Sequence, residues 1–108
     1  MAALNKTIHQ PVRLRIMAVL VTLEAGTEVD FTYLRGLLDV TDGNLGAHLR
    51  KLEEAGYIVV NKTFVERKPR TFVAATAVGR AAFLEHVAAL ESILKVARKD
   101  MGAIGGPS

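Results

Sequence analysis

The sequence contains no cysteine, which excludes disulfide bonds and thiolate metal sites and fits a reducing cytoplasm. Long hydrophobic runs are also missing. The longest apolar stretch, residues 16–21, is far shorter than the roughly 18 residues that a membrane-spanning helix needs. The first residues do not have the layout of a signal peptide, because Lys6, Arg13 and Arg15 interrupt them without a following cleavage site. We therefore expect a cytoplasmic protein without a membrane partner.

Motifs for catalysis are lacking as well: the chain has no glycine-rich phosphate loop, no nucleophile elbow and no evident carboxylate pair. Thr41 and Thr76 are better explained as helix caps than as nucleophiles. The histidines His9, His48 and His86 have no cysteine beside them, and no set of His, Asp and Glu has close metal-ligand spacing. Metal binding or pH sensing by these histidines is an alternative to ordinary polar or interface roles, and a zinc titration would test it. We expect no enzymatic activity, no cofactor and no metal site.

The residues that are present suffice for one globular domain. Of 108 residues, 50% are hydrophobic and 23% are charged. The net charge of +3 is a weak indication of nucleic-acid binding, but the charges are distributed unevenly. Residues 24–42 hold five acids and one base, whereas residues 50–70 hold six bases and three acids. The second stretch predicts a positive surface for a polyanion, with an ordinary solvated charge pattern as the alternative.

The first third of the chain predicts a flexible arm, residues 1–9, followed by two helices. The first helix starts near Pro11 and ends near Gly26, and it is apolar on more than one face, so it needs a second covering surface. A brief strand is expected just before Asp30, which caps the second helix; that helix ends near Asp39. The apolar residues of the second helix share one face: Phe31, Leu34, Leu37 and Leu38.

The third helix is predicted at residues 42–55, with Thr41 as its N-cap and Gly56 as its left-handed end. Because Val40 and Thr41 alone separate it from the second helix, the two must cross sharply, as in a helix-turn-helix. Its apolar stripe consists of Leu45, Leu49 and Leu52. At about 100° per residue, the opposite arc comprises Asn44, Ala47, Arg50 and Lys51, with His48 at its edge.

A β-hairpin and a long helix complete the predicted domain, residues 10–101. Residues 57–65 and 71–73 are rich in β-branched and aromatic side chains, and a cationic turn joins them. Thr76 caps a last helix at about residues 77–99, which would be about 33 Å long at roughly 1.5 Å per residue. Residues 102–108 are expected to be a disordered tail, because they are rich in glycine.

Three segments carry a resemblance to a known family. Residues 42–58 resemble the recognition helix and first wing strand of the winged helix-turn-helix transcriptional regulators of the MarR-like and ArsR-like superfamily. Residues 64–71 resemble the wing, and residues 75–83 resemble the start of the last helix of these proteins. The match covers about residues 9–96. It implies a mainly α fold with a small β-hairpin (α+β), in which a three-helix core carries a wing and a long C-terminal dimerisation helix.

The resemblance further implies a homodimer joined by the first and last helices, with two recognition helices in successive major grooves of double-stranded DNA. The expected interface residues are Ile16, Leu20, Phe83, Val87, Leu90 and Leu94. The operator should be pseudo-palindromic, with half-sites about one turn, roughly 10 bp, apart or a little more. A small molecule could regulate the protein at the dimer interface, but no residue identifies it. One position departs from the family: Gly46 stands where these regulators often carry a hydroxyl residue that contacts phosphate.

The candidate DNA-binding residues lie on helix 42–55 and on the wing, residues 65–71. They are Thr41, Asn44, Ala47, His48, Arg50, Lys51, Arg67, Lys68 and Arg70. For the helix, the alternative is a solvated face, and for the wing a charge cluster that protects a sheet edge. The wing cations have little else to contact, since a hairpin tip cannot bury three charges. For Gly46, packing against the second helix is favoured over close approach to the DNA backbone.

These features together predict a sequence-specific DNA-binding regulator, more a repressor than an activator. A winged helix that binds a protein partner instead of DNA is the rival hypothesis. An architectural DNA binder with little sequence preference is a third.

Overall fold

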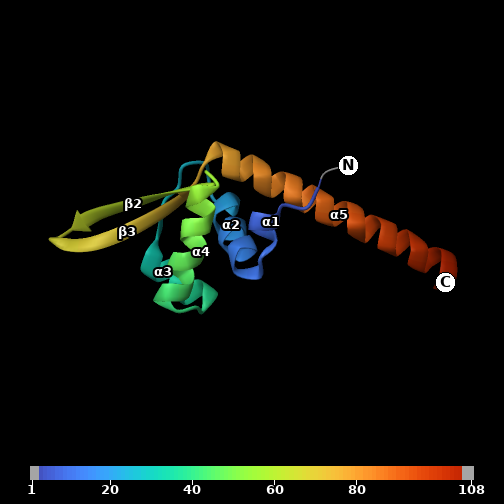
Figure 1. Ribbon diagram of the computed structural model, residues 1–108, viewed down its shortest axis with the longest axis horizontal. Helices are drawn as coiled ribbons and strands as arrows, with labels where there is room; N and C mark the ends of the chain where they lie inside the picture. Colours follow the sequence, from blue (N-terminus) through green and yellow to red (C-terminus); the bar gives the residue numbers. More distant parts are fainter. Residues whose placement is uncertain (1–2, 106–108) are drawn as a thin grey trace.

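The protein consists of a helical body from which a β-hairpin and a long helix project in opposite directions (Figure 1). The computed structural model describes residues 3–105. Its elements are α1 (Lys6–His9), α2 (Pro11–Thr22), β1 (Val29–Asp30), α3 (Phe31–Leu38), α4 (Asp42–Glu54), β2 (Ile58–Val65), β3 (Lys68–Ala75) and α5 (Ala77–Gly105). The strands form one antiparallel sheet in the order β1-β3-β2. The predicted fold class is confirmed, and so is the brief strand expected before α3, which is β1 and pairs with β3.

The helix-turn-helix is formed by α3 and α4, and local capping sets its boundaries. The Asp30 carboxylate accepts hydrogen bonds from the backbone N–H groups of Thr32 and Tyr33, at 2.7 and 3.3 Å. Asp39 ends α3 in the left-handed conformation, with φ of 55°. Thr41 then accepts from the N–H of Asn44 at 3.1 Å and so starts α4. The caps predicted at Asp30 and Thr41 are confirmed.

The core lies between α2, α3, α4 and the sheet. The three leucines of α4 are buried, as their spacing predicted. Ile16 and Leu20 of α2, which were expected at a dimer interface, are 0% and 1% exposed within a single chain. That expectation is wrong for these two residues, because both already belong to the hydrophobic core of the single chain. Leu37 also differs from its predicted position on the buried face of α3, since it is 51% exposed.

The N-terminal segment is part of the packed body and not the flexible arm that was expected. Ile8 of α1 is fully buried in the core. Asn5 caps α1 by accepting from the N–H of Ile8 at 3.0 Å, and its side-chain amide donates to the Tyr57 hydroxyl at 2.8 Å. The guanidinium of Arg13 donates to the carbonyl of Thr7 at 2.5 Å. Tertiary contacts therefore hold a segment too short to be helical alone.

The helix α2 ends earlier than predicted, at Thr22 instead of near Gly26. The guanidinium of Arg80 of α5 caps this end, because it donates to the carbonyls of Val21 and Leu23 at 2.9 and 3.0 Å. These carbonyls lie at the C-terminus of α2, where no helical N–H is available to them. An arginine from a distant element thus caps the helix.

The start of α5 is held tightly against the end of α4. The Thr76 hydroxyl donates to the carbonyl of Gly56 at 2.7 Å and accepts from the N–H of Gly79 at 2.9 Å, and the Thr76 N–H donates to the carbonyl of Tyr57 at 3.0 Å. A Cβ atom at Gly79 would lie 2.0 Å from that Tyr57 oxygen, so this position has no room for a side chain. Gly56 has φ of 80°, as expected for a left-handed helix end. We call these four residues the α4–α5 junction.

Beyond the junction, α5 continues to Gly105, past the predicted end near residue 99. The tail predicted at 102–108 is therefore helical up to Gly105, and residues 106–108 lie outside the described part. The projecting helix makes the molecule elongated, with extents of 64 × 26 × 23 Å (Figure 1). Among the described helices, none combines the length and the apolarity needed to cross a membrane.

Candidate nucleic-acid interface

The helix α4 presents one buried and one exposed face. Leu45, Leu49 and Leu52 point into the core. The exposed positions include Thr41, Asn44, Ala47, Arg50 and Lys51. The structure therefore brings five of the six helix candidates onto one solvent-facing surface. Such a surface can enter a major groove, where polar side chains meet base edges and phosphates.

The sixth candidate, His48, is attached to the body of the protein. It is half-buried, and its Nδ1 lies 3.2 Å from Nη1 of Arg13 on α2. Burial, together with the positive charge of Arg13, lowers the pKa of His48 below its usual value. A neutral ring can accept the Arg13 N–H at Nδ1 and keep its own proton on Nε2. The contact fixes α4 against α2 and leaves His48 at the edge of the exposed face.

A second interaction orders the start of α4. Arg35 of α3 donates to the carboxylate of Asp42 at 2.6 Å, and both side chains are well exposed. An exposed ion pair stabilises the fold little, by about 0–1 kcal/mol. Its effect at this surface is electrostatic, because Arg35 compensates a carboxylate that would otherwise repel phosphate beside Asn44.

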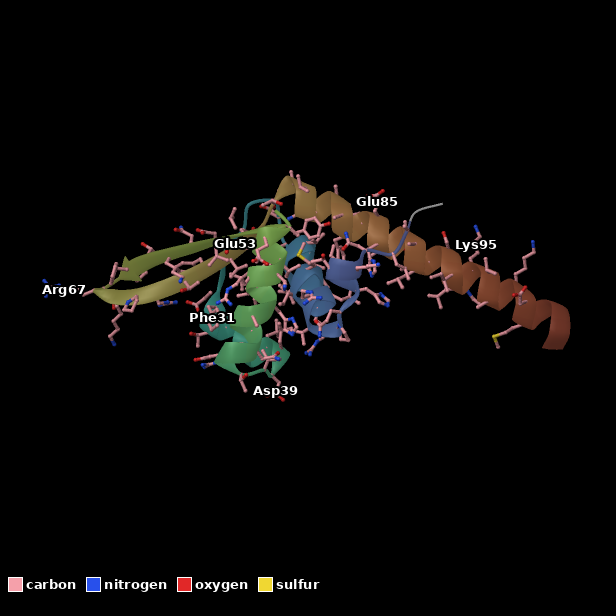
Figure 2. The ribbon with its side chains drawn as sticks, in the orientation of Figure 1. Phe31, Asp39, Glu53, Arg67, Glu85 and Lys95 are labelled. Carbon is pink, nitrogen blue, oxygen red and sulfur yellow. The ribbon has the colours of Figure 1, made fainter. Side chains whose placement is uncertain are left out.

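The hairpin of β2 and β3 forms the wing, and its turn is tighter than predicted. β3 begins at Lys68, so the turn consists of Glu66 and Arg67 alone. Both residues are left-handed, with φ of 51° and 68°. Two positive φ angles are the mark of a type I′ turn, which usually holds Asn-Gly. Figure 2 shows Arg67 at the end of the wing, far from the helices.

Arg70, predicted to be a free wing cation, has a partner in the body of the protein. Its Nε donates to Oδ2 of Asp30 at 2.7 Å, its Nη2 forms a second, shorter contact to the same oxygen, and its guanidinium lies 5.7 Å from the centre of the Phe72 ring. The hydrogen bond from Arg70 is the main cause that lowers the pKa of Asp30. The expectation that all three wing cations lack other contacts is therefore wrong for Arg70. Arg67 and Lys68 are exposed and form no ion pair with any residue that the structure describes.

An open cleft of about 300 Å³ separates α4 from the wing. Its lining residues are Phe31, Gly46, Leu49, Arg50, Glu53, Val60, Lys62 and Thr71. A Cβ atom at Gly46 would meet nothing within 4 Å, so the favoured explanation, close packing against the second helix, is wrong. Instead, Gly46 lines the cleft at a point where an added side chain would face open space. Arg50 and Lys62 place one cation on each side of it.

The register of the sheet identifies a further surface residue that sequence reasoning missed. Phe64 pairs with Pro69 and is 73% exposed. Its β-branched and aromatic neighbours indicated a strand, but not which face of that strand the body would cover. The exposed position of Phe64 could have been found by counting every second residue from Ile58, because residues 58, 60, 62 and 64 then share one face of the strand.

The remaining candidates for the dimer interface lie on α5. Phe83, Val87 and Leu90 are half-buried, and Leu94 is 56% exposed. Other large apolar side chains of α5 are exposed as well: Val78, Leu84, Ile93, Val96 and Met101. No group of three or more His, Cys, Asp or Glu within the described residues could hold a metal ion.

Comparisons with known proteins agree with this geometry. Residues 12–94 match the family model of the winged helix DNA-binding domain. An uncharacterised protein of Methanocaldococcus jannaschii is 38% identical over 82 residues, which are 76% of this chain and 86% of that protein. The structure of a transcriptional regulator homologue from Pyrococcus horikoshii OT3 superimposes with a TM-score of 0.75 at 31% identity, covering 82% of this chain and 85% of that one. NadR in complex with 4-hydroxyphenylacetate shares the fold at a TM-score of 0.61 and 24% identity, covering 94% of this chain and 72% of NadR.

Proposed function

The chain belongs to the family of winged helix DNA-binding domains, and on that basis we propose that it is a homodimeric, sequence-specific transcriptional repressor of the cytoplasm. The observation that carries the proposal is the pairing of two surfaces across one cleft. On one side lies the exposed face of α4, and on the other lies the wing with Arg67 and Lys68. The cleft between them is lined by Arg50 and Lys62 against the single carboxylate of Glu53, and this positive balance attracts the backbone of a duplex.

Within the major groove, Asn44 and Arg50 are the proposed base-reading residues. Asn pairs with adenine and Arg with guanine through two hydrogen bonds each, which discriminate by about 1–3 kcal/mol. Ala47 would contact a thymine methyl group, while Thr41 and Lys51 would contact phosphate. His48 is assigned an indirect role, because its contact with Arg13 orients α4.

The proposed dimer forms through α5. The half-buried Phe83, Val87 and Leu90 and the exposed Leu94 are the proposed interface residues. A second copy would cover the apolar side chains that α5 leaves in water beyond the body. Two wings and two α4 helices would then meet a pseudo-palindrome with half-sites about one turn, roughly 10 bp, apart or a little more. Occupation of such a site would block transcription.

Regulation by a small molecule is a further part of the proposal. It is supported by the likeness to NadR, whose structure holds 4-hydroxyphenylacetate. For this chain the effector would be a small organic molecule, and its binding would alter how the two copies sit on the operator. Titration of 4-hydroxyphenylacetate into the protein–DNA complex is the first test.

The decisive experiment is a selection of bound duplexes from random oligonucleotides, followed by fluorescence anisotropy on the enriched sequence. We expect a motif with two-fold symmetry, and a dimer by sedimentation at the same concentration. Arg50→Ala should relax one base position by about 1–3 kcal/mol. Arg98→Ala removes the same charge from the exposed far part of α5 and serves as the control. Enrichment of no sequence would contradict the proposal, and a partner protein bound through α4 would favour the rival interaction module.

A further inference from the structure

Phe64 is the most exposed of the large apolar side chains among the described residues, at 73%. A phenylalanine gains about 1.5–3 kcal/mol when it moves from water into an apolar environment. This gain is not realised in the single chain. An aromatic side chain left in water near the tip of a wing is therefore a candidate for contact with whatever the wing binds.

The strand register shows which way this residue faces. Phe64 pairs with Pro69, Lys62 with Thr71 and Val60 with Val73. Paired residues of antiparallel strands share a face, and every second residue along a strand returns to it. Val60, Lys62 and Thr71 line the cleft beside α4. Phe64 and Pro69 are thus the next pair outward on the cleft side of the wing, and we call them the wing-tip pair.

The backbone around the wing-tip pair is well constrained. Pro69 has its φ fixed by the ring and lacks an N–H, which matters little where no third strand lies beside β3. The turn that follows Phe64 and Val65 has only two residues, Glu66 and Arg67. A rigid proline ring beside Phe64 on the same face leaves the wing-tip pair few conformations to lose on binding.

The charges around the wing-tip pair indicate the kind of partner. Lys62 precedes Phe64 by two positions on the same face. Arg67 in the turn and Lys68 at the start of β3 follow it, so that three cations stand against the single carboxylate of Glu66. The complementary surface is anionic at its rim and apolar at its centre. Duplex DNA has this arrangement in its minor groove, where phosphates flank the stacked bases.

We propose that Phe64, supported by Pro69, enters the minor groove next to each half-site and partly unstacks one base step, so that the wing bends the DNA. This inference rests on the DNA binding proposed above and adds a deformation to it. Unstacking costs least at pyrimidine–purine steps such as TA and CA, so the wedge would add a sequence preference at a position that α4 does not read.

The test uses the full chain and a duplex carrying the enriched sequence, labelled with a donor and an acceptor at its ends and with 2-aminopurine at the step under the wing. We expect the wild type to increase energy transfer between the ends and to raise 2-aminopurine fluorescence. Phe64→Ala should lose both signals while it retains the salt dependence of binding. Phe64→Leu should restore part of the bend, because leucine can also act as a wedge.

Val65→Ala is the matched control, since Val65 neighbours Phe64 on the opposite face and is itself 40% exposed. It should bend the duplex like the wild type. If the wild type binds the enriched duplex without bending it, or if Phe64→Ala bends it equally, the wedge is wrong while the proposed function stands. If the wild type binds no duplex, both fail. A loss on Phe64→Ala of binding to anionic lipid vesicles, with DNA bending unchanged, would also overturn the wedge.

Discussion

The backbone N–H of Asn5 donates a hydrogen bond to Nδ1 of His86 at 2.9 Å and connects residues that are 81 positions apart. His86 is fully buried, and its Nε2 has no hydrogen-bond partner among the described residues. Because Nδ1 accepts, the neutral ring carries its proton on Nε2. The centres of the His9 and His86 rings are 5.4 Å apart, and the rings meet edge to face. Protonation of His86 would thus remove the contact that holds Asn5.

The first prediction concerns pH. Burial, and secondly the charge of His9, lower the pKa of His86. The unfolded chain, with a histidine pKa of about 6.5, therefore takes up a proton before the folded protein does. We expect the free energy of unfolding to fall as pH drops below about 6.5 and to level off below the folded pKa. Urea denaturation across this range would measure the slope.

Two variants separate the contributing groups. His86→Gln keeps an acceptor for the Asn5 N–H but does not titrate. The free energy of unfolding of this variant should therefore depend less steeply on pH. His48→Gln should reduce the slope in the same direction, because the pKa of His48 is lowered as well. Asp30 acts in a separate window: its lowered pKa gives stability that is lost only as pH falls below about 4. If the free energy of unfolding of the wild type stayed constant from neutral pH to about pH 5, His86 would take up its proton equally well in the folded and unfolded states, against this prediction.

The second prediction compares two glycines. Gly79→Ala should destabilise the fold by about 1–3 kcal/mol, because the new Cβ would lie 2.0 Å from the backbone oxygen of Tyr57. Gly46→Ala should stabilise it by about 1 kcal/mol, because α4 gains a better helix former where nothing lies within 4 Å. Chemical denaturation measures both. If both variants changed the free energy of unfolding equally, the backbone at Tyr57 would have to move aside for the new side chain at position 79.

The third prediction separates the wing cations by the salt dependence of DNA binding. The double variant Arg67→Ala, Lys68→Ala should flatten the slope of log K against log salt by about 0.9 per lost phosphate contact. Arg70→Ala should change the slope less, because Asp30 already compensates its charge. Arg70→Ala should lower the stability by about 1 kcal/mol, at the upper end for surface ion pairs, because the side chain of Asp30 is only 17% exposed. A slope that Arg70→Ala flattens equally would show that the pair with Asp30 opens on DNA.

The fourth prediction concerns the wing turn. Glu66 and Arg67 are both left-handed, which costs about 1–2 kcal/mol for a residue with a side chain. Glu66→Asn should raise stability and leave DNA binding intact, since Asn tolerates this conformation. Arg67→Gly should raise stability but weaken binding, because a cation is lost. Thermal melts and anisotropy would record the two effects, and an Arg67→Gly variant that binds normally would remove Arg67 from the interface.

The bounds of α3 and α4 and the start of α5 could be predicted because capping is local. Asp30, Thr41 and Thr76 bond to backbone groups two or three positions away, and such spacings can be read from the sequence. Gly56 ends α4 for an equally local reason, its positive φ. The burial of the three leucines of α4 could likewise be predicted, from their helical spacing.

The errors concern contacts between distant residues. Arg70 binds Asp30 across 40 positions, and no local pattern joins them. Ile16 and Leu20 were assigned to a dimer interface, because periodicity shows that a face is apolar but not which surface covers it. Ile8 belongs to a four-residue helix that is stable only against its neighbours.

The α4–α5 junction has a mechanical consequence. Thr76, Gly79 and the carbonyls of Gly56 and Tyr57 fix the direction in which α5 leaves the body. With 29 residues the helix is about 43 Å long, so a tilt of about 5° at its root displaces the far end by about 4 Å. That is close to the spacing of successive base pairs along one strand, about 3.4 Å. The four residues of the junction are therefore the pivot of α5, and a small rotation there would shift a second copy bound along this helix, as proposed above, by about one base pair relative to the DNA.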